Sequence, residues 1–155
     1  MKKSVLFLFL ILSINAANAQ KIRFKVSGEK DTLVNLIKYF GKGLYYADTA
    51  AMKNGVVTFD GSKQKPGILG LLLSGQRYFE FVYDNEDIDM ETSGPEFVKN
   101  MKVIKSDENK VFIPYVDYIT TKKTEAGKLG EERSKFTDKD PQFKTLGNQI
   151  DAINK

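Results

Sequence analysis

The stretch Asn54-Gly55-Val56-Val57-Thr58-Phe59-Asp60-Gly61 indicates how this chain folds. Both central positions of a type I′ turn need positive φ, which Asn and Gly tolerate best, so Asn54-Gly55 predicts a tight turn between strands. Residues 56–59 are all β-branched or aromatic and predict a strand that runs into a second turn at Asp60-Gly61. This short stretch therefore predicts β structure.

The same pattern extends on both sides of this stretch, from residue 20 to about residue 105. Ile22, Phe24 and Val26 alternate with basic residues, which predicts a half-buried strand with a basic outer face. Further strands are expected over 33–40, from 44 onward, over 68–73 and 78–83, around 88–90, and at an edge over 101–104 after Gly94-Pro95. The apolar run 68–73 is expected to be central, with Gly70 marking a bulge. Residues 20–105 thus predict a mainly β domain, either an antiparallel sandwich or a barrel-like meander.

The periodicity changes at Ser106, which can cap a helix whose first turn is acidic. Apolar residues then recur at helical spacing through Ile119, although Pro114 should kink this helix or delay its start. Asp140-Pro141 predicts the start of a second helix, which carries a narrow apolar stripe. The stripe consists of Phe143, Leu146, Ile150 and Ile153. Residues 106–155 therefore predict a helical connector or hairpin, which makes the fold α+β overall. The stripe of the second helix is expected to be covered by the first helix, by a second copy of the chain or by a further domain.

Residues 1–19 have the features of a cleavable signal peptide. Lys2 and Lys3 form a basic start, residues 5–12 are apolar, and Ala17-Asn18-Ala19 places small residues before a cleavage point at Gln20. The apolar run is well below the roughly 20 residues that a membrane-spanning helix needs. We therefore expect a periplasmic or secreted protein that does not insert into the membrane after cleavage.

Composition excludes several classes of function. The chain contains no cysteine and no histidine, so thiol redox chemistry, histidine bases and ordinary zinc sites are unavailable. Residues 1–19 contain two lysines and no acidic residue, which leaves 22 basic and 20 acidic residues and a net charge of about +2. A charge this small does not predict nucleic-acid binding. We expect no enzyme activity, no cofactor and no catalytic or metal-ligating residue.

The densest group of carboxylates comprises Asp84, Glu86, Asp87, Asp89 and Glu91. On a strand, Asp87, Asp89 and Glu91 point to one face while Ile88 and Met90 point to the other. This alternation is typical of a solvated face over a core. The functional alternatives are a calcium site, although the glycine and spacing of an EF-hand are missing, and a glycosidase pair.

The aromatic residues concentrate in two segments, and their members are Tyr39, Phe40, Tyr45, Tyr46, Tyr78, Phe79, Phe81 and Tyr83. Neighbouring residues on a strand face opposite sides, so about half of these rings should be buried. The others either pack across strands or form a platform for a sugar or peptide. An exposed row of tyrosines would favour the platform.

Three segments resemble a known family: Tyr39-Phe40-Gly41-Lys42-Gly43, Ala47-Asp48-Thr49-Ala50 and residues 54–61. They are similar to the uncharacterised β-rich N-terminal domain, domain of unknown function 4369, of Bacteroidetes-type envelope proteins. The resemblance continues through Phe79-Glu80-Phe81-Val82 and into Ser106-Asp107-Glu108-Asn109. In that family the domain commonly precedes a thioredoxin-like or alkyl hydroperoxide reductase/thiol-specific antioxidant domain. This chain ends before any such domain, so we expect a stand-alone accessory domain or a truncated product.

Taken together, these features predict a non-catalytic, exported accessory domain that docks a protein partner through its helical segment. By resemblance, its setting is periplasmic thiol-disulfide or peroxide metabolism. The alternative is a carbohydrate- or peptide-binding β-sandwich of the cell envelope, with a glycan as its ligand. A carboxylate-based hydrolase is a minor third hypothesis.

Overall fold

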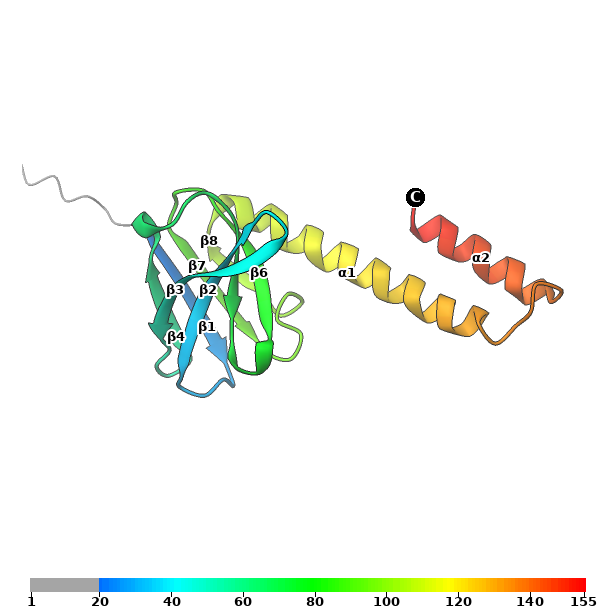
Figure 1. Ribbon diagram of the computed structural model, residues 1–155, viewed down its shortest axis with the longest axis horizontal. Coiled ribbons are helices and arrows are strands. Elements are labelled where there is room, and N and C mark those ends of the chain that lie inside the picture. The colour runs from blue at the N-terminus through cyan, green and yellow to red at the C-terminus, as the bar shows by residue number, and fades with distance from the viewer. Residues whose placement is uncertain (1–19) are drawn as a thin grey trace, which may run out of the picture.

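The computed structural model describes residues 20–155, so the expected signal peptide at 1–19 lies outside the described residues. Two four-stranded sheets pack face to face, and two helices follow them (Figure 1). The prediction of a mainly β domain followed by a helical hairpin is confirmed.

The first sheet has the strand order β4-β1-β7-β8. Its members are β1 (Lys21–Ser27), β4 (Val56–Asp60), β7 (Ile88–Ser93) and β8 (Lys102–Lys105). The pairs β1–β4 and β7–β8 are antiparallel, whereas β1 and β7 run parallel. This parallel pair lies in the centre of the sheet and departs from an all-antiparallel sandwich.

The second sheet has the strand order β3-β2-β5-β6, and all its pairs are antiparallel. Its members are β2 (Leu33–Phe40), β3 (Gly43–Ala51), β5 (Gly67–Leu72) and β6 (Tyr78–Tyr83). Short 3-10 helices, η1 (Gly61–Lys63) and η2 (Ser74–Gln76), precede β5 and β6. The expected central position of the apolar run in β5 is confirmed.

Gly70 does not mark a bulge, because β5 pairs in continuous register with both of its neighbours. A Cβ on Gly70 would lie 2.9 Å from Cγ1 of Ile37, so the glycine provides the space that Ile37 occupies. The register shift of this sheet lies instead in the β2–β3 pair. Leu36 pairs with Asp48 and Ile37 pairs with Tyr46, so Ala47 is an extra residue on β3 without a partner on β2.

The core fills the space between the two sheets. Phe24 of β1 is fully buried, and its ring meets Phe79 and Phe81 of β6 edge-on at centroid distances of 5.4 and 4.9 Å. Such aromatic pairs each contribute about 0.5–1.5 kcal/mol beyond the area they bury. Tyr83 is also fully buried, and its hydroxyl donates to the Gly61 carbonyl at 2.8 Å. The hydroxyl is thus satisfied inside the core.

The Asn54-Gly55 turn connects the two sheets. Both residues have positive φ, 50° and 73°, as a type I′ turn requires. Lys53 and Val56 flank the turn and exchange backbone hydrogen bonds of 2.9 Å. Beyond this single bridge, β3 joins the second sheet and β4 joins the first. The turn was predicted from the sequence, but the division of its two strands between sheets was not.

The helices form an antiparallel hairpin that projects from the sandwich (Figure 1). Helix α1 (Asp107–Arg133) begins after Ser106, whose hydroxyl accepts from the Asn109 backbone N–H, as predicted. It runs through Pro114, so proline does not delay its start. Helix α2 (Pro141–Ile153) starts at the predicted residue and folds back along the distal part of α1, where Arg133 stacks on Phe143 at 3.9 Å.

Candidate functional site

The outer face of the first sheet is covered by ion pairs. Arg23 meets Asp89 at 2.5 Å and Lys25 meets Glu91 at 3.7 Å, because these residues are direct neighbours in the parallel β1–β7 register. Asp87 accepts from Lys105 at 2.7 Å, which holds the pKa of its carboxyl below the usual range. We call this surface the charged face.

Asp87, Asp89 and Glu91 therefore lie on the solvated face that their alternation predicted. Glu86 stands apart from the others and accepts from the Ser106 hydroxyl at 2.5 Å, next to the start of α1. Across residues 20–155, no group of three or more His, Cys, Asp or Glu residues is arranged to hold a metal ion. Four of the five carboxylates have cationic or hydroxyl partners, namely Glu86, Asp87, Asp89 and Glu91.

The outer face of the second sheet is almost entirely apolar. Strand pairing and alternation assign its outward side chains. They are Leu33, Asn35, Ile37 and Tyr39 of β2; Leu44, Tyr46, Thr49 and Ala51 of β3; Ile68, Gly70 and Leu72 of β5; and Tyr78, Glu80 and Val82 of β6. Glu80 is the one charged residue in this set. We call this surface the apolar face.

Six large side chains of the apolar face are exposed to solvent in the part of the chain that the structure describes. Leu33, Tyr39, Leu44, Tyr46, Ile68 and Tyr78 are between 45% and 71% exposed. A strand spacing of about 4.8 Å and a same-face repeat of about 6.7 Å give the fourteen outward positions roughly 450 Å² of flat sheet. A sheet face that exposes several large apolar side chains together is often a functional surface.

Glu80 is held within the apolar face by tyrosine. The Tyr39 hydroxyl on β2 reaches across β5 and donates to Glu80 Oε1 on β6. This hydrogen bond is the main cause that raises the pKa of Tyr39 to about 12, with Tyr78 as a smaller contributor. Tyr39, Tyr78 and Glu80 form one polar group within the apolar face.

The predicted aromatic residues divide as expected between core and surface. Phe79, Phe81 and Tyr83 are buried, whereas Tyr39, Phe40, Tyr45, Tyr46 and Tyr78 are exposed. Tyr45 and Tyr46 lie on opposite sides of β3, and Tyr45 packs edge-on against Phe40 at 6.1 Å instead of joining the apolar face. Sequence reasoning missed Leu33, Leu44 and Ile68, because an exposed aliphatic residue on a strand looks like a core residue until the pairing is known.

A groove opens at one end of the apolar face, where β2 extends beyond its ladder with β5. That ladder ends at Lys38–Leu69, while β2 continues with β3 to Phe40. The groove has a volume of about 650 Å³. Its charged lining residues are Lys38, Lys63 and Lys65, and it shares Tyr39 and Ile68 with the apolar face. We call it the lysine groove.

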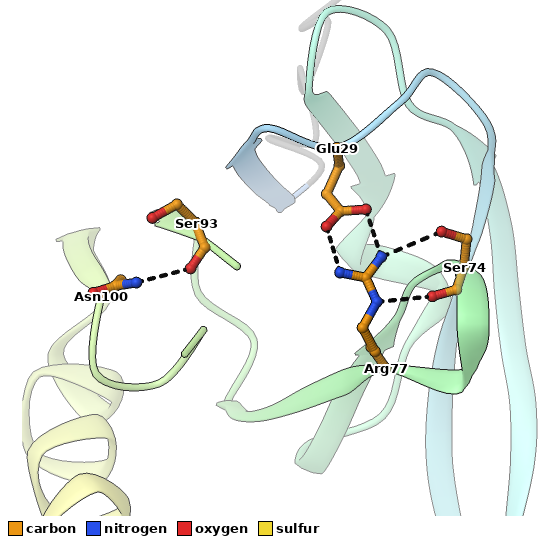
Figure 2. A network of polar contacts seen from close by, with 5 residues as sticks. All are labelled: Glu29, Ser74, Arg77, Ser93 and Asn100. Carbon is orange, nitrogen blue, oxygen red and sulfur yellow. Dashed lines mark hydrogen bonds and ion pairs between the residues drawn. The ribbon is translucent and has the colours of Figure 1, made fainter. Parts of the chain in front are cut away.

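The opposite end of the sandwich is fastened by a polar network (Figure 2). Arg77 donates to both carboxylate oxygens of Glu29 at 2.6 and 2.7 Å and to the Ser74 carbonyl at 3.2 Å. The Arg77 guanidinium lowers the pKa of Glu29. Nearby, the Asn100 amide donates to the Ser93 carbonyl at 3.0 Å. These hydrogen bonds fix loops to strand ends. The polar groups of Arg77, Glu29 and Asn100 are used in these internal contacts.

The start of α1 closes the open edge of β6. The Asn109 side chain accepts from the Val82 N–H at 2.8 Å and donates to the Val82 carbonyl at 2.6 Å, as a neighbouring strand would. Ile113, one turn later, is part of the sandwich core.

Comparison with known proteins supports the β unit as a family domain. Residues 20–112 match the model of a family described as Domain of unknown function (DUF4369). No curated protein and no solved structure matched the chain. Among the described residues, neither helix combines the length and apolar character needed to cross a bilayer. The matched range includes both sheets and the first turns of α1, and on this match the chain belongs to the DUF4369 family.

Proposed function

We propose that this chain is a non-catalytic accessory domain of the cell envelope that binds a carbohydrate or peptide segment through its apolar face. The observation that carries the proposal is the exposed set of large side chains around Tyr39, Tyr46 and Tyr78 on one side of a rigid sheet. Aromatic rings with a hydroxyl provide a large contact area together with a hydrogen-bonding group. Such a surface suits a ligand with both apolar and polar parts.

The carboxylate within the apolar face favours a short ligand over a second copy of the chain. Tyr39 donates to one oxygen of Glu80. Sheet-on-sheet packing of two copies would bury the other oxygen against apolar residues without a donor, which is costly. A ligand with hydroxyl or amide donors satisfies Glu80 while covering the tyrosine rings.

The proposed setting is periplasmic thiol-disulfide or peroxide metabolism, by resemblance to domains that precede thioredoxin-like domains. The chain has no cysteine, so thiol chemistry would belong to a partner. Export is supported by the signal-peptide features of residues 1–19.

Sedimentation with envelope material tests the proposed binding face. Purified residues 20–155 would be mixed with washed envelope fragments of the source cell, and the bound fraction measured after centrifugation. We expect Tyr46→Ala to reduce binding, whereas the matched control Tyr45→Ala, on the other side of β3, should bind like the parent. Equal binding by the parent and Tyr46→Ala would contradict the proposal.

A protein-docking surface on the helical segment is the second candidate. Val111, Tyr115 and Tyr118 lie at i, i+4 and i+7 on α1 and are 74%, 60% and 60% exposed. This spacing places them on one helix face, as in helices that dock into a groove. Loss of envelope binding in Tyr118→Ala, with Tyr46→Ala unaffected, would favour this candidate over the apolar face.

A further inference from the structure

The lysine groove is a second binding feature, distinct in its chemistry from the apolar face. It lies between the end of the β2–β3 hairpin and the segment from η1 to the start of β5. The extra residue Ala47 lines the groove at the point where the β2–β3 register shifts. Its volume of about 650 Å³ is within the range of roughly 300–1,000 Å³ typical of small-molecule sites.

The charges of the groove are all positive. Lys38, Lys63 and Lys65 are its charged lining residues, and no aspartate or glutamate lines it. Lys63 lies 4.0 Å from Asp60 at the rim, which offsets part of its charge. No ion pair within residues 20–155 involves Lys38 or Lys65. Two lysines without an ion-pair partner within these residues therefore line one groove.

A buried donor in the same groove lacks a partner. Nε2 of Gln64 is buried and makes no hydrogen bond within the described chain, and Gln64 lines the groove. An amide N–H₂ left unsatisfied inside a protein is destabilising, so such a group is informative wherever it occurs. Here it adds a donor to the two lysines, and all three groups call for an acceptor-rich, anionic ligand.

The walls of the groove are apolar and aromatic. Phe40, which is 75% exposed, and Pro66 line it beside the lysines. A ring with C–H groups on its faces can stack against Phe40 while its substituents reach the lysines. An acidic peptide of aspartate and glutamate carries the negative charge without a ring to stack on Phe40, which favours an acidic sugar over an acidic peptide.

We propose that the lysine groove binds an acidic glycan, a chain of uronate residues, with carboxylates on Lys38 and Lys65 and a ring on Phe40. Nε2 of Gln64 is closed off from solvent in the unliganded chain, so the Gln64 side chain rotates on binding to donate to a ring hydroxyl or carboxylate oxygen. This site shares Tyr39 and Ile68 with the apolar face, but its ligand class follows from its own charges and lining.

Calorimetric titration of residues 20–155 with a short oligogalacturonate tests this assignment. The same oligomer with methyl-esterified carboxyls is the uncharged control ligand, and poly-glutamate is the acidic peptide control. We expect binding of oligogalacturonate that weakens as salt is added, because exposed charges are screened. We expect no measurable binding of the ester. Equal affinity for poly-glutamate and oligogalacturonate, or binding of the ester as strong as that of the acid, would overturn the assignment.

Variants separate the groove from general electrostatics. Lys38→Ala with Lys65→Ala should weaken binding about tenfold, the effect of two exposed ion pairs. The control pair, Lys102→Ala with Lys123→Ala, removes the same charge from exposed positions outside the groove and should bind like the parent. Equal losses in both pairs would show a non-specific charge effect and refute the site.

Gln64→Leu gives a second readout that does not depend on charge. Removing an unsatisfied buried amide should leave the thermal midpoint unchanged or higher, while oligogalacturonate binds more weakly. Unchanged affinity in this variant would contradict the role of Gln64. If oligogalacturonate does not bind at all but Tyr46→Ala still reduces envelope binding, this inference fails and the proposed function stands.

Discussion

At the residue scale, one hydrogen bond gives the apolar face its polar character. Tyr39 and Glu80 come from strands separated by β5, and their contact depends on both side chains pointing to the same side of the sheet. The negative carboxylate disfavours the tyrosinate, because the phenolic proton is shared with Glu80 and a second negative charge would be close by. The pair therefore couples the ionisation of Tyr39 to a carboxylate two strands away in the same sheet.

Glu80→Gln should lower the pKa of Tyr39 from about 12 toward the ordinary tyrosine value. A pKa raised by folding contributes stability below about pH 10 that is lost as the pH rises through about 12. Absorbance titration of the phenolates, compared with Tyr39→Phe, measures the change. Glu91→Gln on the charged face serves as the control, and an unchanged Tyr39 titration in Glu80→Gln would contradict the coupling.

The Arg77–Glu29 pair predicts a different pH dependence. Arg77 lowers the pKa of Glu29, so the stability from this pair is present above the unfolded value of about 4.3 and is lost as the pH falls through the folded value. Glu29→Gln should lower the thermal midpoint at neutral pH, and the difference from the parent should shrink in acid. Glu96→Gln, in an exposed i,i+3 pair with Lys99, should show little change. A pH-independent difference would be evidence against the ion pair.

At the element scale, the helical hairpin is largely held together by its own residues. Leu146 is buried, and the rest of the α2 stripe is half-buried, where α2 lies along the distal part of α1. Arg133 stacks on Phe143 and donates to its carbonyl at 3.1 Å. Of the three covers considered for the stripe, the structure places the first helix of the same chain there, through the part beyond Ile119.

Leu146→Asp should detach α2, because an unpaired carboxylate in the interface is costly. A short helix without tertiary packing is marginal in water. The helical signal in circular dichroism should fall while the main thermal transition of the sandwich keeps its midpoint. Gln149→Asp, at an exposed position of the same helix, should retain the parent spectrum. If both variants match the parent, the packing of α2 on α1 does not support the helix.

At the scale of the whole molecule, the β unit and α1 share a core. Ile113 belongs to the core cluster that residues of both sheets form, and Asn109 closes the edge of β6. The family match also runs past the end of β8, to residue 112. The first turns of α1 thus complete the sandwich, and the remainder of the hairpin projects away from it.

Shortened chains should show where the folding unit ends. Residues 20–120 keep Asn109 and Ile113 and should unfold cooperatively near the midpoint of the sandwich in the longer chain. Residues 20–105 lose both, leaving a β edge unpaired and core side chains uncovered, and should be markedly less stable or aggregate. Thermal melting followed by circular dichroism distinguishes them, and equal midpoints would mean that α1 contributes nothing to the sandwich.

Processing of the exported protein tests the predicted leader. Mass spectrometry of protein recovered from the envelope fraction should find Gln20 at the N-terminus, because the small residues before it suit signal peptidase. An intact Met1 in that fraction would refute the signal-peptide prediction.

Local signals in the sequence determined much of the fold. Alternation around Phe24, the positive-φ turn at Asn54-Gly55 and the caps at Ser106 and Asp140 each depend on neighbouring residues, so they could be read directly. The charged face was also predictable, since the residue types of β1 and β7 alternate along each strand. These features involve contacts or preferences over a few positions, and tertiary context did not override them.

Only the tertiary structure decided which residues come together on the charged face, on the apolar face and in the lysine groove. The parallel pairing of β1 with β7 brings Arg23 to Asp89, and the order β3-β2-β5-β6 gathers Leu33, Tyr46 and Tyr78 on one face. The lysine groove likewise joins Lys38 with Lys65 where β2 extends past its ladder with β5. Such pairings join residues far apart in the chain, and alternation shows that a strand has two faces without showing which strands will lie beside it.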